Sequence, residues 1–580
     1  MTSPSDVERP RTVIEVIRDN AVETGHAITF VRADGRERVV PYPDLWVEVR
    51  RRAAGLAARG LKKGDRIALI LPEPDEFVLT FLGALAAGVV AVPMYPPQTM
   101  AKLEAYGNTL RHVLGASDAG AVVVGESVRE MLAQQIMGSE TPTLAPGDLH
   151  VDEVPASLPT TVTLDDLAFL QFTSGSTSRP KGVMVSFGNL AANARAIMFD
   201  GLEATPVDKG VSWLPLFHDM GLIGFVVAPL YAKVQVMLLP TTRFIRRPSM
   251  WLEAIDRFRG TITFAPNFAF ALATRAVRAS QAQDWDLSCM RALGCGAEPI
   301  QADVLRGFLD RFAAQGLAPT SILPSYGMAE ATLAISFADL HGPLRTDVID
   351  TEALKHGRAE PVAPDAPGRT ELVSCGRAFP GHDVVVVADG DGAPAPERTV
   401  GEIWTRGPSC TAGYFDNPEA SAETFSNGWL RTGDLGYLAD GELYICGREK
   451  DLIILNGKNY YPQDIERIVS AVEGVRDDQC VAFSRLDPSG AEVAVVVAEG
   501  RRAAVASDEV RDAIVAAVRQ ALGVTIDEVV FIPRGTLPKT SSGKVQRRAA
   551  RQRLEAGSLP LLTPELTIED EALSERAPVS

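Results

Sequence analysis

The stretch Phe172–Gly182, with the sequence FTSGSTSRPKG, restricts the fold of this chain more than any other stretch. It follows the apolar run Leu167–Leu170, so it predicts a loop at the end of a buried strand. Backbone N–H groups, hydroxyls and a lysine in such a loop can surround a polyphosphate. The Walker A pattern GxxxxGK[ST] requires Ser or Thr after the lysine, and Gly182 stands there instead. The stretch therefore predicts a phosphate loop of a different type, although similar clusters also form ordinary turns.

Seven further motifs follow this stretch in order along the chain. They are WLPLFHDMG at 213–221, GCGAEP at 294–299, SYGMAEATL at 325–333, GEIWTRGP at 401–408, WLRTGDLGYL at 429–438, GREKDLIILNGKNYYPQDIE at 447–466 and PKTSSGKVQRR at 538–548. Together the eight motifs resemble the adenylate-forming superfamily of acyl- and aryl-CoA ligases, peptide-synthetase adenylation domains and luciferases. The resemblance extends from about residue 45 to residue 551, so it implies that nearly the whole chain is such an enzyme.

Length and charge limit the classes of function. A chain of 580 residues exceeds the usual domain size of about 100 to 200 residues, so more than one core is expected. The net charge of −17 disfavours nucleic acid as a partner. It also disfavours anionic ATP unless lysines and Mg²⁺ provide positive potential locally.

Cysteine spacing indicates neither a zinc site nor a disulfide framework, because the six cysteines lie far apart and form no CxxC pair. We therefore expect a reduced, cytoplasmic setting. The uncharged stretch Phe77–Tyr95 contains Gly83, Gly88 and Pro93, so it predicts a helix followed by a buried strand. No transmembrane segment and no signal peptide are expected.

Short apolar runs alternate with amphipathic stretches, which indicates an α/β fold with parallel sheets flanked by helices. The expected strands are 66–71, 89–93, 121–124 and a fully buried strand at 384–387, and the expected helices are 76–87, 101–114 and 189–198. We expect a large N-terminal adenylation domain of mixed sheets at residues 1–449. A small, mobile α+β domain at 450–557 and an acidic tail at 558–580 would follow it.

The small domain has its own pattern of short elements. It comprises a strand at 452–455, a turn at Asn456 and Gly457, a helix at 462–472, strands at 481–483 and 493–498, and a helix at 507–522 capped by Ser507. By resemblance, Lys450 is the hinge on which this domain turns.

The resemblance implies which residues bind ATP. Tyr326 would stack on adenine, Gly296, Ala297 and Glu298 would line its other side, and the Asp434 carboxylate would accept the ribose hydroxyls. Without the resemblance, Asp434 is equally consistent with turn chemistry beside Gly433. The full implied set is Thr173, Ser174, Gly175, Ser176, Thr177, Lys181, Gly296, Ala297, Glu298, Ser325, Tyr326, Gly327, Met328, Asp434 and Arg448.

Catalysis must bring a carboxylate and the α-phosphate of ATP together, so positive charge is needed where these anions meet. By resemblance, Lys544 in the loop TSSGK supplies that charge. Glu330 of YGMAE and Thr177, with help from Thr173, would hold Mg²⁺. Position alone would suggest a solvated lysine at 544 and a helix N-terminal charge at Glu330.

Two further positions stand out beside the phosphate loop. His218 in LPLFHD matches a superfamily position near that loop and the acyl entrance, so we expect a catalytic contribution. A lone histidine is more often a core residue. Ser178 stands where many members have glycine, which should change the flexibility of the loop more than the chemistry.

The interval between Tyr326 and Gly401 is longer than in typical acyl-CoA ligases, with the extra residues around Thr346–Thr370. An added segment there, with VPMYPP at 92–97, resembles the fatty acyl-AMP ligase branch. That branch converts a medium- or long-chain fatty acid and ATP into acyl-adenylate and pyrophosphate. It then transfers the acyl group to the phosphopantetheine thiol of an acyl carrier protein or a polyketide synthase carrier domain.

The added segment would disfavour CoA as the acceptor by packing on the large domain and restricting rotation of the small domain about Lys450. Two alternatives remain open at this point. One is a fatty acyl-CoA ligase that shares the first step, and the other is a nucleotide-binding protein without turnover.

Overall fold

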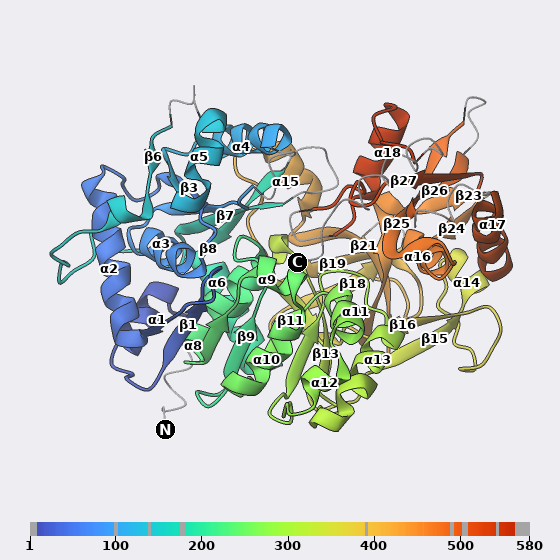
Figure 1. Cartoon of the computed structure of the whole chain (residues 1–580), viewed down its shortest axis with the longest axis horizontal. Coiled ribbons are helices and arrows are strands. Elements are labelled where there is room, and N and C mark those ends of the chain that lie inside the picture. Colours follow the sequence, from blue (N-terminus) through green and yellow to red (C-terminus); the bar gives the residue numbers. More distant parts are fainter. Residues whose placement is uncertain are drawn as a thin grey trace, which may run out of the picture. The chain divides into compact units, whose positions relative to one another are not determined.

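The computed structural model describes residues 9–97, 103–136, 141–173, 180–388, 392–455, 457–487, 492–500, 508–540 and 544–562. By their contacts the residues form two compact units. Unit 1 comprises residues 1–345, 373–384 and 404–432, and unit 2 comprises residues 346–372, 385–403 and 433–580. The chain is coloured from blue at its start to red at its end in Figure 1.

A six-stranded sheet of unit 1 carries the phosphate-loop stretch. Its strands, in spatial order, are β6 (Thr143–Leu144), β5 (Ala121–Val124), β3 (Arg66–Ile70), β4 (Val90–Pro93), β7 (Leu167–Thr173) and β8 (Lys181–Ser186). All neighbours are parallel except β7 and β8, which are antiparallel. The prediction of a parallel sheet flanked by helices is confirmed here.

Both faces of this sheet are buried. Because side chains alternate along each strand, each strand contributes to the core on both faces. On β3, Ile67 and Leu69 join the core cluster that contains α3 (Pro74–Ala86), whereas Ala68 and Ile70 join the one that contains α4 (Leu103–Ser117) and α5 (Glu126–Ile136). Figure 1 shows α3 on one side of the sheet and α4 and α5 on the other. The uncharged stretch at 77–95 is therefore α3 and β4, as predicted. Within the described parts of the chain, no helix is long and apolar enough to cross a membrane.

A nine-stranded mixed sheet forms the rest of the core of unit 1. Its strands, in spatial order, are β17 (Arg377–Ala378), β14 (Ala334–Phe337), β13 (Ile322–Gly327), β12 (Ala292–Cys295), β11 (Ile262–Ala265), β9 (Lys209–Ser212), β10 (Gln235–Leu238), β1 (Ala27–Val31) and β2 (Glu37–Pro41). The strands from β13 to β1 run parallel, while β14, β17 and β2 pair antiparallel at the two ends.

The remaining helices of unit 1 are mostly short. They are α1 (Val13–Asn20), α2 (Tyr42–Ala58), η3 (Pro146–Leu149), α6 (Phe187–Arg195), η4 (Ala196–Gly201), α7 (Asp219–Leu222), η5 (Ile223–Val227), α8 (Ala228–Tyr231), α9 (Thr241–Arg246), α10 (Ser249–Phe258), α11 (Asn267–Ala276), α12 (Ala279–Ala282), α13 (Ala302–Phe312), η6 (Ala313–Gln315), η7 (Ala329–Ala331) and α15 (Pro418–Thr424). Of these, α6 begins two residues before the predicted start, because Ser186 caps it by accepting the Asn189 N–H.

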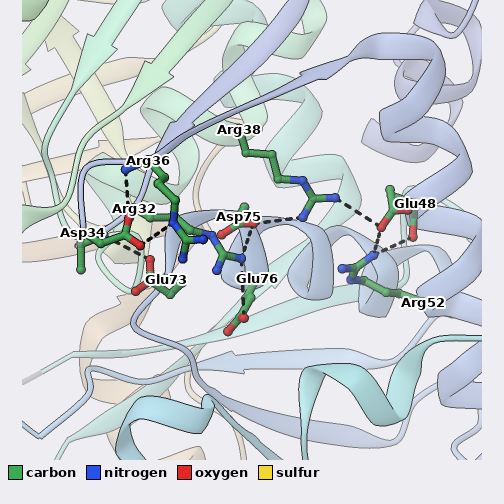
Figure 2. A network of polar contacts seen from close by, with 10 residues as sticks. Arg32, Asp34, Arg36, Arg38, Glu48, Arg52, Glu73, Asp75 and Glu76 are labelled. Carbon is green, nitrogen blue, oxygen red and sulfur yellow. Dashed lines mark hydrogen bonds and ion pairs between the residues drawn. The ribbon is translucent and has the colours of Figure 1, made fainter.

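A charged network ties the β1–β2 hairpin to α2 and α3, as Figure 2 shows. Its centre is Asp75, whose side chain is fully buried. Arg32 and Arg38 donate to Asp75 Oδ2 at 2.7 and 3.0 Å. Burial raises the pKa of the Asp75 carboxyl, but the hydrogen bonds from the two guanidinium groups outweigh it, so the pKa lies below its ordinary value.

Unit 2 contains a three-stranded sheet covered on both faces. Its described strands are β25 (Val475–Leu486), β26 (Glu492–Gly500) and β27 (Glu528–Ile532). One face packs on α16 (Pro462–Ser470) and α17 (Asp508–Leu522), and the other packs on Ala550 of α18 (Arg547–Glu555). The other elements are β15 (Thr346–Asp350), α14 (Thr351–Lys355), β16 (Arg369–Val373), β22 (Glu442–Arg448), η8 (Glu449–Asp451), β23 (Ile453–Leu455) and β24 (Lys458–Tyr460).

One predicted strand differs in burial. The strand expected at 384–387 exists as β18 (Asp383–Val387), but Asp383 is exposed and Val384 and Val385 are only half-buried. The reason is that β18 is the edge strand of a five-stranded sheet with β19 (Gly401–Arg406), β21 (Trp429–Ala439), β20 (Phe425–Ser426) and β22. The expectation of full burial was therefore wrong.

In unit 2, the strand predicted at residues 481–483 is part of β25, which extends from Val475 to Leu486. The predicted turn residue Asn456 and helix cap Ser507 lie outside the described residues.

Candidate nucleotide-binding site

The phosphate-loop stretch is the connection between β7 and β8. Thr173 at the end of β7 pairs with Lys181 at the start of β8, so these two predicted residues lie opposite one another. On the return side, His112 of α4 contacts the carbonyl oxygen of Pro180 at 2.8 Å through Nε2. The predicted phosphate ligands Ser174, Gly175, Ser176 and Thr177, and the variant position Ser178, lie outside the described residues.

The residues predicted to bind adenine meet at the carboxyl ends of two parallel strands. Cys295 on β12 is opposite Pro324 on β13, so the segments that follow both strands lie side by side. A Cβ on Gly296 would lie 2.6 Å from Ser325 Oγ, so this close approach requires glycine. Ser325 Oγ itself donates to the Cys295 carbonyl at 3.1 Å. The predicted Ser325, Tyr326 and Gly327 complete β13.

Three residues at this edge have features that the fold explains. The Glu298 carboxylate accepts the Phe268 N–H in the first turn of α11 at 2.6 Å, where a helix has backbone donors to satisfy. Ala297 has a positive φ of 71°, which turns the backbone sharply after β12. Burial raises the pKa of the Cys295 thiol well above its usual value, which keeps it protonated and unreactive.

Glu330 lies in a short 3-10 turn, η7, directly after Met328. The Glu330 carbonyl accepts the Thr411 N–H at 2.9 Å, and Thr332 Oγ1 donates to the Ser409 carbonyl at 2.6 Å. Thr332 has a φ of +69°, which is strained for a β-branched residue. The segment 409–411 therefore holds this turn in place from a distant part of the chain.

Tyr414 is a residue of this site that the sequence did not reveal. Its hydroxyl donates to Glu330 Oε1 at 2.8 Å, and the Lys181 Nζ lies 4.9 Å from the centre of its ring. Both the hydrogen-bond partner and the cation are predicted site residues. A single tyrosine after a glycine carries no signal for such a contact, because its partner Glu330 is 84 residues away.

His218 caps the short helix α7 and contacts Asp219, with its Nδ1 facing the Oδ1 of that carboxylate. The preceding carbonyl, of Phe217, accepts a hydrogen bond of 3.0 Å from Gln171 Nε2 on β7. The Phe217 ring lies 6.0 Å from that of Tyr95 in the VPMYPP motif. The residue before His218 is thus bonded to β7, the strand that precedes the phosphate-loop stretch, and Gln171 is a contact that the sequence did not reveal.

The other predicted residues belong to unit 2. Asp434 on β21 is opposite Arg448 on β22, and Arg448 Nε donates to Asp434 Oδ1 at 2.7 Å. Lys450 lies in η8. The backbone N–H of Lys544 donates to Thr540 Oγ1 at 3.1 Å, and its carbonyl accepts the Thr540 N–H at 2.7 Å.

A resident metal centre is not evident. Within the described ranges, no three His, Cys, Asp or Glu side chains are close enough to hold a metal ion. A single buried carboxylate, Glu330, suits Mg²⁺ that arrives bound to phosphates, because that ion keeps few protein ligands.

Comparisons with known proteins identify the family of the chain. Residues 17–415 match the AMP-binding enzyme family, and residues 450–562 match the AMP domain of the Disco-interacting protein 2-like family. The chain is 37% identical over 541 residues to a Caulobacter vibrioides (strain NA1000 / CB15N) protein named as an acyl-CoA synthetase, covering 92% of this chain and 94% of that one.

Two fatty acyl-AMP ligases are also similar. The chain is 35% identical over 579 residues to long-chain-fatty-acid–AMP ligase FadD26 of Mycobacterium tuberculosis (strain ATCC 25618 / H37Rv), covering 94% of this chain and 97% of that one. A solved structure from a study of fatty acyl-adenylate ligases of E. coli and L. pneumophila has a TM-score of 0.88 and 33% identity, covering 95% of this chain and 99% of that one. The chain therefore belongs to the AMP-binding enzyme family, in its fatty acyl-AMP ligase branch.

Proposed function

We propose that this enzyme joins a medium- or long-chain fatty acid to the α-phosphate of ATP. A carboxylate oxygen of the fatty acid attacks the α-phosphorus, the bond to the β-phosphate oxygen breaks, and pyrophosphate leaves. The observation that carries this proposal is that Tyr414 of unit 1 contacts both Lys181 at the start of β8 and Glu330 in the turn after β13, whose end lies beside that of β12. Together they offer a phosphate loop, a platform for a base and a carboxylate for a cation.

The nucleotide-binding roles follow from these positions. We propose that Tyr326 stacks on adenine and that the backbone of Gly296, Ala297 and Glu298 lines the opposite side. The backbone is the better candidate at Glu298, because its carboxylate already accepts the Phe268 N–H. In unit 2, the Asp434 carboxylate would accept the ribose hydroxyls, and the hydrogen bond from Arg448 supports this role by orienting that carboxylate.

Glu330 is the residue we assign to Mg²⁺, and Thr177 is the second ligand that the resemblance implies. When bound, Mg²⁺ would neutralise charge on the phosphates that must separate. The enzyme's own contribution is a buried carboxylate in a fixed turn. Glu330 is 8% exposed and is anchored through both its carbonyl and its side chain.

We propose that the Lys544 side chain lies where the fatty acid carboxylate and the α-phosphate of ATP meet. Its ammonium would offset the negative charge of the fatty acid carboxylate and the α-phosphate as they approach. Two hydrogen bonds between Thr540 and Lys544 fix the backbone of the lysine within unit 2. His218 would contribute beside the phosphate loop.

For the second step, we propose that the acyl group passes to a phosphopantetheine thiol of an acyl carrier protein rather than to CoA. Support comes from the added segment, which bonds to residues on both sides of the proposed hinge Lys450. Asp347 accepts from Arg398 at 2.9 Å and from Tyr437 at 2.8 Å. Lys355 Nζ donates to the Leu522 carbonyl at 2.7 Å. These bonds all lie within unit 2 and would resist rotation about Lys450.

The rival function, a fatty acyl-CoA ligase, has support in the name of the Caulobacter relative. Both steps can be tested with the full-length protein. Pyrophosphate release that requires both ATP and fatty acid separates an enzyme from a mere nucleotide binder, and hydroxylamine trapping detects acyl-adenylate. Parallel reactions with CoA and with a phosphopantetheinylated carrier protein then identify the acceptor. A faster reaction with CoA would refute the proposal about the second step alone.

We also propose a cytoplasmic setting. All six cysteines are free, and four of them are buried. Burial raises the pKa of the Cys375 thiol to about 12, which is consistent with cysteines that serve as small apolar core residues.

A further inference from the structure

Tyr414 lies in a segment that runs beside the first residues of β8. Met184 N–H donates to the Gly413 carbonyl at 3.0 Å, and Phe415 N–H donates to the Gly182 carbonyl at 2.8 Å. Tyr414 itself is bridged to Val183. The backbone of Tyr414 is therefore fixed relative to the strand that begins at Lys181.

The side chain of Tyr414 links the two charges of the site. Its hydroxyl hydrogen-bonds Glu330 Oε1 at 2.8 Å, and Lys181 Nζ lies over its ring at 4.9 Å from the centroid. Tyr414 and Glu330 are only 7% and 8% exposed. A hydrogen bond to a charged group is stronger than one between neutral groups, and shielding from water strengthens it further.

The link has a specific consequence for Glu330. Its backbone is already held by Thr411 through the carbonyl bond. That bond leaves the side-chain torsions of Glu330 undetermined. The Tyr414 hydroxyl restricts those torsions by holding one carboxylate oxygen, and its ring provides a favourable face for the Lys181 ammonium.

We propose that Tyr414 is a positioning residue that orients the Glu330 carboxylate and the Lys181 ammonium for the Mg²⁺ complex of ATP. This inference rests on the proposed function, in which Glu330 and Lys181 face the cation and the phosphates. Tyr414 touches neither reactant in this role and acts through its two neighbours. A purely structural tyrosine would stabilise the fold of unit 1 without affecting metal-dependent nucleotide binding.

The test compares binding of α,β-methylene-ATP with and without metal in the full-length protein. Tyr414→Phe keeps the ring and removes the hydroxyl. Mn²⁺ serves as the probe ion, and electron paramagnetic resonance reports its bound fraction. We expect Tyr414→Phe to weaken binding of the Mn²⁺–nucleotide complex by about tenfold, the usual effect of a lost hydrogen bond to a charged group. Binding of the metal-free nucleotide in EDTA should change less than about twofold, because the proposed role concerns the metal complex. A general structural loss would weaken binding both with and without metal.

Tyr42→Phe is the matched control. The Tyr42 hydroxyl is also buried in unit 1 and donates to the Val234 carbonyl at 3.0 Å, and neither residue belongs to the site. We expect this control to bind the Mn²⁺–nucleotide complex like the wild type. Thermal unfolding of both variants reports whether they fold.

Three results would overturn the proposal. They are unchanged Mn²⁺–nucleotide binding in Tyr414→Phe, an equal loss with and without metal, and failure of Tyr414→Phe to fold, since the proposal assigns the hydroxyl to binding. Glu330→Gln separates this inference from the proposed function. If Glu330→Gln binds the Mn²⁺ complex normally, the metal role of Glu330 fails. If only Glu330→Gln loses binding, Tyr414 alone is wrongly assigned.

Discussion

Lys355 Nζ donates a hydrogen bond of 2.7 Å to the carbonyl of Leu522, the last residue of α17, across 167 positions of sequence. The final carbonyls of a helix have no partner within it and carry partial negative charge, so a lysine is well suited to that place. Lys355 and its neighbour Glu352 come from the added segment, and Glu352 also pairs with Lys458. The segment thus contacts elements that follow Lys450.

Breaking this contact should increase the use of CoA. In Lys355→Met the tether to α17 is lost, so we expect the ratio of CoA thioester to carrier-bound product to rise by up to about tenfold, the effect of one charged hydrogen bond. Chromatography of products from parallel reactions measures the ratio. Lys233→Met, which removes an ion pair with Glu23 in unit 1, is the control. An unchanged ratio in a folded Lys355→Met protein would contradict the tether.

A point substitution is a better test than deletion of residues 346–370. Ile349 and Leu354 of the segment are buried in a core cluster with Tyr437. Deleting the segment would remove this apolar packing together with the tether, and a misfolded product would mimic a loss of function.

Lys544→Ala should reduce adenylation by on the order of 10² or more while ATP binding changes little, because the charge acts mainly in the transition state. Fatty-acid-dependent pyrophosphate release and a nucleotide-binding titration measure the two quantities. Lys539→Ala is the control from the same loop region, where Lys539 Nζ donates to Gln479 Oε1 at 2.6 Å. Similar turnover in wild type and Lys544→Ala would remove Lys544 from the mechanism.

Asp434→Asn should raise the KM for ATP by about tenfold or more, because a neutral amide accepts the ribose hydroxyls less strongly and loses the charge partner of Arg448. The KM for 2′-deoxy-ATP should change much less, since that nucleotide already lacks a hydroxyl. Steady-state kinetics with both nucleotides is the measurement. Asp440→Asn, at a positive-φ turn position that tolerates asparagine, should behave like wild type. Equal effects on both nucleotides would place Asp434 away from the ribose.

Asp75→Asn should destabilise unit 1 by about 2 kcal/mol at neutral pH, because the buried carboxylate that Arg32 and Arg38 share is lost. The pKa of Asp75 is lowered in the folded state, so the stability it contributes is present above its unfolded pKa, about 3.9. That contribution disappears as the pH falls through the lower, folded pKa. The difference in free energy of unfolding between wild type and variant should therefore be constant near neutral pH and should decrease below about pH 4.

Urea unfolding followed by tryptophan fluorescence measures this difference, since all six tryptophans belong to unit 1. Asp34→Asn is the control, because Asp34 pairs with the exposed Arg36 on the same hairpin, where an ion pair contributes little. A difference in stability that widens in acid would show that the ionised Asp75 carboxylate does not stabilise unit 1.

Local pattern was sufficient for much of the fold. Strict apolar runs predicted β3, β4 and β5 and the helices between them, and the motif order predicted that Gly296 and Ser325 serve one site. Such features depend on neighbouring residues and on strand ends that parallel pairing brings together. The burial of β18 was predicted wrongly, because an apolar run does not reveal whether its strand is at the edge of a sheet.

Other features required the folded chain. The Tyr414 hydroxyl reaches Glu330 over 84 residues, and Lys355 reaches Leu522 over 167, through side chains that are ordinary in their local sequence. Long-range packing between elements brings these groups together, and no periodicity or spacing encodes that packing. The motifs thus identified the reaction, whereas three-dimensional packing selects the side chains that hold its charged residues in position.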